Sequence, residues 1–131
     1  MNKILITGAS GGIGSAITDK FEKLDNTLIL TSSSDSKLDI LKKKYGEKNF
    51  YYVLNFNEPK LLEDSLIKIA SEHKDLNVIV NNAGITDDSL ILRMNNDQWK
   101  KVIEANLTSN FTIIRNLLPI MIRNKRGKII G

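Results

Sequence analysis

Glycines are concentrated near the start of the chain, where backbone groups could bind a phosphate. The apolar run Ile4-Leu5-Ile6 leads into Thr7 and then into glycines at positions 8, 11, 12 and 14. Glycine tolerates positive φ and lets a ligand approach the backbone closely. Apolar residues at helical spacing follow, from Ile13 to Leu24, so free N–H groups and a positive helix end would face one point. The spacing favours a dinucleotide site, and an ordinary strand-to-helix turn is the simpler alternative.

Hydroxyl side chains follow the second apolar run, at the place where dinucleotide-binding proteins contact the adenosine ribose. A carboxylate there usually holds the 2′-hydroxyl of NAD, but this chain has Thr31-Ser32-Ser33. Hydroxyls can donate hydrogen bonds to a 2′-phosphate. Asp35 is interpreted as a helix cap in preference to a ribose ligand. The sequence therefore favours NADP (NADPH) as cofactor over NAD.

The elements that must position these residues alternate between strand and helix. Apolar and β-branched runs predict strands at about residues 4–6, 26–31, 50–54, 77–81 and from 128 onward, with helical patterns between them. Asp35 or Ser36 is expected to cap the second helix, and a long helix is expected from about Asp97 to Arg123 with Asn96 or Asp97 as its cap. The alternation predicts an α/β fold, a doubly wound parallel sheet of order 3-2-1-4-5, with a ligand crevice where strands 1 and 4 separate.

Composition restricts the class of protein. The chain has 131 residues, of which 41% are hydrophobic and 26% charged, and its net charge of +4 is too small to indicate nucleic-acid binding. No apolar run approaches the ~18 residues of a membrane span, and the N-terminal run is too short for a signal peptide, so we expect a cytoplasmic protein. The chain has no cysteine, and its one histidine, His73, is expected to be a solvated surface residue, so no metal site is predicted.

Two motifs at this separation resemble the short-chain dehydrogenase/reductase family. They are Thr7-Gly8-x-x-x-Gly12-x-Gly14 and Asn81-Asn82-Ala83-Gly84. Within the family, the chain is most similar to the bacterial 3-oxoacyl-(acyl-carrier-protein) reductases. Further residues that carry this similarity are Leu54-Asn55-Phe56, Asn81 to Thr86, Leu92-Arg93-Met94, Trp99 and Glu104-Ala105-Asn106-Leu107.

This resemblance implies NADPH-dependent reduction of a 3-oxoacyl thioester on acyl carrier protein, in fatty acid synthesis, by a homo-tetramer. Another short-chain reductase, or an alcohol or polyol dehydrogenase, is the alternative within the family. A non-catalytic NADP-binding regulator is the alternative from a different class. By the same resemblance, the basic residues Arg123, Lys125 and Arg126 would lie near the docking site of the acidic carrier protein; their simpler interpretation is favourable pairing with a helix C-terminus.

The resemblance also assigns residues to the cofactor. Asn55 would bind the adenine amino group beside Phe56, and Thr31 with neighbouring hydroxyls would meet the 2′-phosphate. Gly11 occupies the place of a basic residue that many NADP-using relatives carry, which weakens the electrostatic case for NADP. The pyrophosphate would be held by the glycine loop, through Gly8, Ser10, Gly11, Gly12, Ile13 and Gly14, and the ribose side would be lined by Asn82, Ala83 and Gly84.

Asn106 is the candidate catalytic residue. It falls on an apolar helix face with Trp99 and Ile103, so we expect a buried amide with specific partners, and a purely structural amide is the alternative. The resemblance makes it the fourth member of a Ser-Tyr-Lys-Asn tetrad, in which it holds a water of the proton relay. The other three members would follow strand 5. We therefore expect residues 1–131 to be a dinucleotide-binding domain, incomplete at its C-terminus and inactive alone.

The long helix is apolar over much of its circumference. Leu107, Phe111, Ile114 and Leu118 form one stripe, which Ile113, Leu117 and Met121 widen. Such a helix is expected to pack on its own sheet and on a partner. Pro119 within it predicts a kink or another local irregularity.

Overall fold

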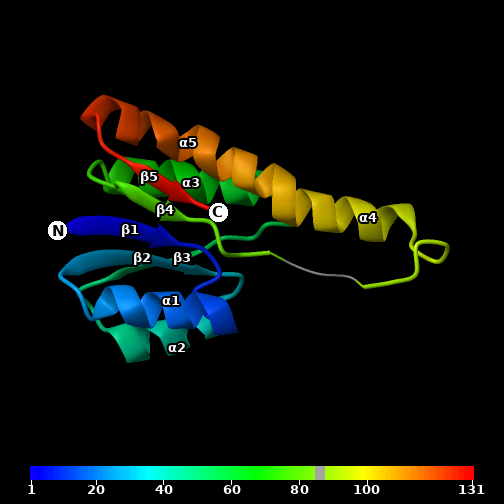
Figure 1. Cartoon of the computed structure of the whole chain (residues 1–131), viewed down its shortest axis with the longest axis horizontal. Coiled ribbons are helices and arrows are strands. Elements are labelled where there is room, and N and C mark those ends of the chain that lie inside the picture. The colour runs from blue at the N-terminus through cyan, green and yellow to red at the C-terminus, as the bar shows by residue number, and fades with distance from the viewer. Residues whose placement is uncertain (85–87) are drawn as a thin grey trace.

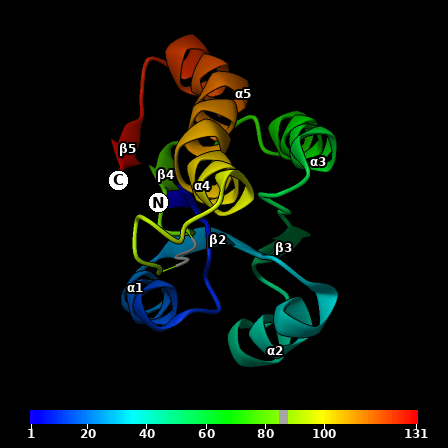
Figure 2. The same cartoon turned by 90° about the vertical axis from the view of Figure 1, so that its right-hand side faces the viewer.

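The computed structural model describes residues 1–84 and 88–131, and its parallel sheet lies between two layers of helices (Figures 1 and 2). The strands are β1 (Asn2–Ile6), β2 (Asn26–Ser32), β3 (Phe50–Val53), β4 (Val78–Val80) and β5 (Lys128–Ile130). The helices are α1 (Gly12–Glu22), α2 (Asp35–Tyr45), α3 (Pro59–Glu72), α4 (Asn96–Ile103) and α5 (Ser109–Asn124), and a π-helical turn, η1 (Glu104–Thr108), joins the last two. The order β3-β2-β1-β4-β5, with every pairing parallel, confirms the predicted doubly wound sheet.

Alternate residues of the central strands divide the core into two layers. Leu5 of β1 lies beside Ile29 and Ile79 in the sheet, and these three side chains pack with α3 and α5. The intervening residues face α1 and α2, because successive side chains of a strand point to opposite faces. Helices α1 and α2 therefore cover one face of the sheet, and α3 and α5 cover the other (Figure 2). The second layer contains Ile4, Ile6, Leu28, Leu30, Val78 and Val80, packed with Leu38, Leu41 and Tyr45 of α2.

Both predicted N-caps are wrong by one residue. Ser34 caps α2 by accepting a hydrogen bond from the Lys37 N–H at 3.4 Å, so Asp35 already lies in the first turn. Asn95 caps α4, where its side chain and that of Gln98 form a capping box. In each helix the cap is the polar residue just before the predicted ones. The cap residue must have extended backbone while the residue after it is already helical.

The long helical segment is irregular at η1, whereas α5 continues through Pro119. This wide turn ends at Thr108, about three helical turns before the proline that predicted an irregularity. Pro119 lacks an N–H, which costs one backbone bond. Single π-helical turns inside α-helices often occur at functional sites.

His73 is buried, at 1% exposure, and not solvated as expected. It caps the C-terminus of α3, and its ring packs edge-on against Phe50 at 4.5 Å between centroids. Its Nε2 lies 2.7 Å from the Tyr52 hydroxyl, and its Nδ1 lies 3.4 Å from the Lys3 ammonium. Burial, followed by the charge of Lys3, lowers the pKa of His73. The prediction of a solvated residue rested on the charged neighbours Glu72 and Lys74. It is wrong because the end of α3 packs against β3 and buries the ring.

The apolar residues of two helices divide between the core and the surface. Ile17 and Phe21 of α1 pack against the core, whereas Ile13 and, just after the helix, Leu24 are exposed. In α5, Ile113, Leu117 and Met121 face the core, as expected of a helix that packs on its own sheet. The stripe of Leu107, Phe111, Ile114 and Leu118 is exposed or half-buried.

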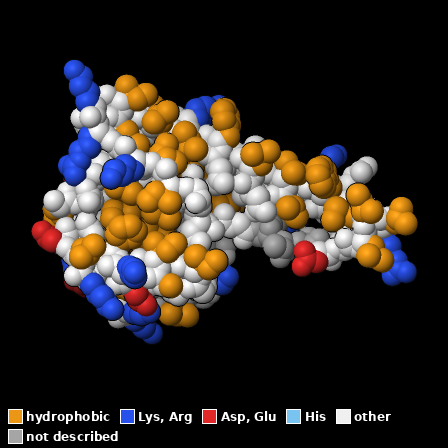
Figure 3. Space-filling view, in the orientation of Figure 1, with side chains coloured by type: hydrophobic (Ala, Val, Ile, Leu, Met, Phe, Trp, Pro, Cys, Tyr) orange, Lys and Arg blue, Asp and Glu red, His pale blue; other side chains and the backbone are white. Residues whose placement is uncertain are grey.

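Helix α4 extends beyond the carboxyl edge of the sheet, and none of its residues is buried (Figure 1). Trp99 is 60% exposed, and apolar side chains line this projecting segment (Figure 3). Asn106 is exposed as well, so the expectation of a buried amide is wrong. Within residues 1–84 and 88–131, no helix combines the length and apolar character needed to cross a membrane.

Candidate functional site

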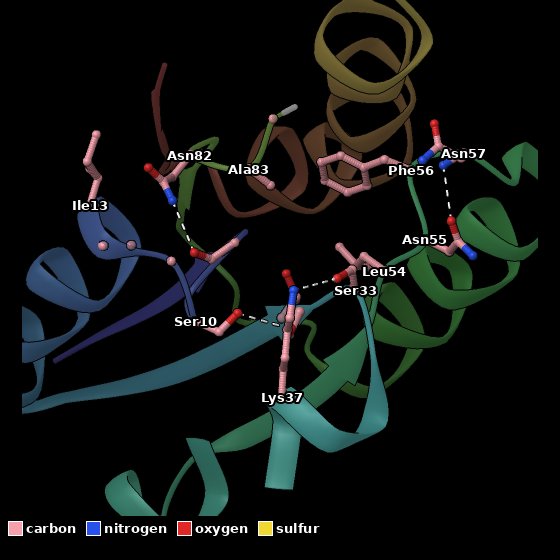
Figure 4. Close-up of a pocket in the computed structure, with 17 residues that line it drawn as sticks. Ser10, Ile13, Ser33, Lys37, Leu54, Asn55, Phe56, Asn57, Asn82 and Ala83 are labelled. Atoms are coloured by element: carbon pink, nitrogen blue, oxygen red, sulfur yellow. Dashed lines mark hydrogen bonds between the residues drawn. The ribbon is translucent and has the colours of Figure 1, made fainter. Parts of the chain in front are cut away.

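A pocket of about 460 Å³ opens at the carboxyl edge of the sheet, between the β1–α1 loop and the ends of β2, β3 and β4. Every residue predicted to bind the cofactor lines it, from four separate segments of the chain (Figure 4). These residues are Gly8, Ser10, Gly11, Gly12, Ile13, Gly14, Thr31, Asn55, Phe56, Asn82, Ala83 and Gly84. Ser32, Ser33, Lys37, Leu54 and Asn57 line it in addition.

The glycine loop requires glycine at two positions for steric reasons. Gly8 has φ +64°, and a methyl group there would lie 2.9 Å from the Cα of Ala83. A methyl group on Gly14 would overlap the carbonyl oxygen of Gly8 and lie 2.7 Å from Nδ2 of Asn82. The loop is also fixed by the Ala9 N–H, which donates to the Thr31 carbonyl at 3.0 Å. Gly12, at the first position of α1, has no heavy atom within 4 Å of such a methyl, so its backbone is open to the pocket.

Thr7 and Asn82 hold the ends of β1 and β4 together at the point where the two strands separate. The Thr7 hydroxyl accepts hydrogen bonds from the N–H groups of Asn82 and Ala83, at 3.1 and 3.0 Å. The Asn82 amide donates to the carbonyls of Thr7 and Gly8, both at 3.2 Å (Figure 4). The sequence analysis included Thr7 in the glycine motif but assigned it no role. A polar residue directly after an apolar strand could have indicated that its hydroxyl has a specific partner.

The hydroxyl of Thr31 is not presented to the pocket. Thr31 is 1% exposed, and its hydroxyl donates to the Ile6 carbonyl at 3.4 Å, across the sheet. The available hydroxyls at this end belong to Ser10 and Ser32, whose oxygens lie 3.2 Å apart, and to Ser33. Successive side chains of a strand point to opposite faces, so Ser32 lies on the other face of the sheet from Thr31 and lines the pocket.

Lys37 is a residue of the pocket that sequence analysis missed. Its ammonium lies 3.5 Å from the Ser33 hydroxyl and reaches into the pocket from the first turn of α2 (Figure 4). The signal was available, since Lys37 is the first basic residue after Lys23 and follows the cap Ser34 by three positions.

The loop after β3 is anchored to α5. The Ser109 hydroxyl lies 3.1 Å from the Phe56 carbonyl and 2.7 Å from the Glu104 carbonyl, so it connects this loop to η1. Phe56 itself is 9% exposed. The Asn55 side chain accepts from the Asn57 N–H at 3.1 Å, which closes a local turn and orients the loop at the pocket.

Asn106 does not line the pocket but lies at its margin, in η1. A methyl group on Gly84 would lie 2.9 Å from its Oδ1, so the end of the Asn-Asn-Ala-Gly motif touches the candidate catalytic amide. Ile85 and Thr86, which carried part of the family resemblance, and most of the loop expected over residues 84–88 lie outside the described residues.

The pocket presents groups suited to binding a dinucleotide. The glycine loop and the N-terminus of α1 supply backbone N–H groups for phosphates, and Ile13, Phe56 and Ala83 supply apolar surface. The residues described as lining it include no carboxylate, histidine or tyrosine, so this part of the chain offers a cradle and not an acid–base pair.

Comparison with known proteins gives a consistent result. The family model described as short chain dehydrogenase matches residues 2–131. The 3-oxoacyl-(acyl-carrier-protein) reductases FabG of Escherichia coli and Rickettsia typhi are 35% and 38% identical to this chain, over 126 and 127 residues. These matches cover 96% and 97% of this chain but 52% and 51% of the relatives, so the chain spans about half the length of the curated relatives it matches.

Solved structures of the same fold are also similar. A metagenomic short-chain oxidoreductase in complex with NADP superposes with a TM-score of 0.88 at 27% identity, covering 98% of this chain and 60% of that one. Serine dehydrogenase from Escherichia coli superposes with a TM-score of 0.85 at 26% identity, covering 97% of this chain and 59% of that one.

Proposed function

Because the chain belongs to the short-chain dehydrogenase family, we propose that it is the cofactor-binding part of an NADPH-dependent reductase of 3-oxoacyl thioesters on acyl carrier protein. The family supports an oxidoreductase that uses a nicotinamide cofactor. The substrate is suggested by relatives at 35–38% identity that bear this name. The single observation that carries the proposal is the glycine-lined pocket at the strand separation, with all the expected binding residues around it.

The proposed binding roles combine the family resemblance with the contacts around the pocket. Backbone N–H groups around Gly12 and Ile13 would hold the pyrophosphate at the positive end of α1. Asn55 and Phe56 would bind the adenine, and Ala83 and Gly84 would line the adenosine ribose. Asn82 orients the cradle, because its amide holds the Gly8 carbonyl in place.

The proposed catalytic role of this chain is limited to Asn106. When bound, the cofactor supplies a hydride for a carbonyl carbon. Asn106 would hold a water of the proton relay, next to Gly84, and the serine, tyrosine and lysine of the tetrad would come from the region that the relatives carry beyond residue 131. The basic end of α5, with Arg123, Lys125 and Arg126, would face the acidic carrier protein. A homo-tetramer in the cytoplasm, with α4 and α5 in an interface, completes the proposal.

Titration of the 15N-labelled 131-residue chain with NADPH, followed by NMR, tests the binding function. We expect amide shifts at Gly8, Gly12 and Gly14 and none in the Lys128–Ile130 strand, with weak affinity for this part of the protein alone. Shifts spread evenly over the chain, or none at millimolar NADPH, would contradict a dinucleotide site. Submicromolar binding would instead favour the non-catalytic regulator, because such affinity would not need the remaining half.

The substrate is tested on protein that includes the region corresponding to the other half of the relatives. The assay follows NADPH oxidation with acetoacetyl thioesters of acyl carrier protein, with sugars and alcohols as competing substrates. Preference for the carrier-bound thioester supports the proposal. Oxidation of serine or a simple alcohol as the preferred reaction would support the alternative dehydrogenase.

A further inference from the structure

The end of β2 carries a small polar cluster in which one residue, Lys37, has no role assigned so far. It consists of Ser10, Ser32, Ser33 and Lys37 and forms one side of the pocket (Figure 4). Ser10 and Ser32 contact each other at 3.2 Å, and the Lys37 ammonium lies 3.5 Å from the Ser33 hydroxyl. Among the described residues, Lys37 is the single cation of the pocket lining.

The position of Lys37 follows from the cap of α2. Ser34 accepts from the Lys37 N–H, which fixes the first turn of α2 against the end of β2. A helical side chain leans toward the helix N-terminus, so the Lys37 side chain extends back over this turn to Ser33. The side chain is exposed, and within the described part of the chain it forms no ion pair.

A cation is unfavourable at this position in the absence of an anion. The N-terminus of a helix carries a partial positive charge, which repels a lysine in the first turn. The other lysines of α2, Lys42 to Lys44, lie in its last turn, where the dipole favours them. A bound phosphate would reverse the sign at Lys37, because the ammonium, the helix end and the serine hydroxyls would all then face an anion.

We propose that Lys37, with Ser33, determines cofactor choice by binding the 2′-phosphate of NADP; this inference rests on the proposed dinucleotide function. The end of β2 is where folds of this class contact the ribose 2′ position, with a carboxylate selecting NAD and a cation accommodating the phosphate. The residues described as lining the pocket include no carboxylate, and Asp35, on the same turn as Lys37, is not among them. The chain thus supplies from α2 the positive charge that Gly11 cannot supply from the glycine loop.

The test compares NADPH and NADH on the full chain by NMR titration, for the wild type, Lys37→Met and the control Lys42→Met. Lys42 is exposed on the same helix and does not line the pocket. We expect Lys37→Met to weaken NADPH about tenfold, as for loss of one charge-assisted contact, and to leave NADH within about twofold. Lys42→Met should change neither. Added KCl should weaken NADPH binding more steeply in the wild type than in Lys37→Met.

Two results would overturn the inference, and they differ in what they say about the proposed function. In the first, the wild type binds both cofactors, and Lys37→Met leaves both affinities unchanged or weakens them equally. Lys37 would then not be the selecting residue, although the dinucleotide site would stand. Failure of the wild type to bind either cofactor would overturn the inference together with the proposed function. Ser33→Ala gives a second reading, with a loss of about two- to fivefold expected for NADPH and none for NADH.

Discussion

Replacing Gly14 by alanine tests whether steric contact, and not flexibility, determines the glycine loop. A methyl group at this position overlaps the Gly8 carbonyl oxygen, which belongs to the backbone and cannot rotate away. Either α1 or the loop must then move, at a cost of about 1–3 kcal/mol for overpacking. The movement would also break the 3.2 Å hydrogen bond from Asn82 to Gly8, worth about 1 kcal/mol.

The higher helix propensity of alanine, about 1 kcal/mol, offsets part of this cost. We expect a net loss of about 1–3 kcal/mol, which lowers the Tm by roughly 4–12 °C in a domain of this size. The matched control is Gly12→Ala, because a methyl on Gly12 meets no heavy atom within 4 Å. This control gains the propensity without the overlap, so its Tm should be equal to or above that of the wild type.

Thermal unfolding by circular dichroism, with an NADPH titration of both variants, separates the two effects. Gly12→Ala should keep its stability but bind NADPH more weakly, since its methyl would point into the open pocket. A Gly14→Ala protein that melts at or above the wild-type Tm would refute the steric reasoning. Equal destabilisation of both variants would show that the loop tolerates no side chain, for a reason other than contact with Gly8.

Three further perturbations test other parts of the structure. Folding lowers the pKa of His73 below its ordinary 6.5. The neutral imidazole therefore contributes fully to stability above about pH 6.5, and this contribution is lost as the pH falls. Between about pH 7 and pH 5, the Tm of His73→Gln should decline less than that of the wild type. Thr7→Val leaves two N–H groups without their acceptor and should cost about 1–3 kcal/mol in urea unfolding. Thr112→Val removes a local hydroxyl bond to the Thr108 carbonyl four residues earlier and should stay within about 0.5 kcal/mol. Ser109→Ala should cost about 1 kcal/mol and speed amide exchange in residues 104–108, and unchanged exchange there would contradict its connection to Phe56.

Much of the fold was predictable because local patterns and general topology rules agree. The apolar runs around Leu5, Ile29 and Ile79 identify strands, since each is flanked by turn residues and covered on both faces. Right-handed crossovers then leave few arrangements for alternating strands and helices. Topology also predicted where the crevice lies, because carboxyl ends of parallel strands meet at one edge of the sheet. The assignment of individual residues to the pocket came from the family resemblance, and positions such as Gly12 and Asn82 are brought together at that edge.

Side-chain environments were less predictable, because they depend on which element packs against which. His73 sits between charged residues in sequence, yet the end of α3 places it against Phe50 and Tyr52. Thr31 belongs to the predicted hydroxyl cluster, but the pleat of β2 turns its hydroxyl toward Ile6. Asn106 matches an apolar spacing, but α4 projects beyond the sheet and leaves that face exposed.

The sequence by itself determined the order of the elements, the parallel sheet and the glycine cradle, since these depend on short-range periodicity and on the steric requirements of single residues such as Gly8. Only the tertiary structure decided that Lys37 enters the pocket, that Thr7 joins β1 to β4, and that η1 replaces a regular turn beside Gly84. These features join residues that are distant in sequence, or they require the direction of a side chain. Both are set when helices and strands pack together, and local patterns in the chain indicate such residues without fixing their partners.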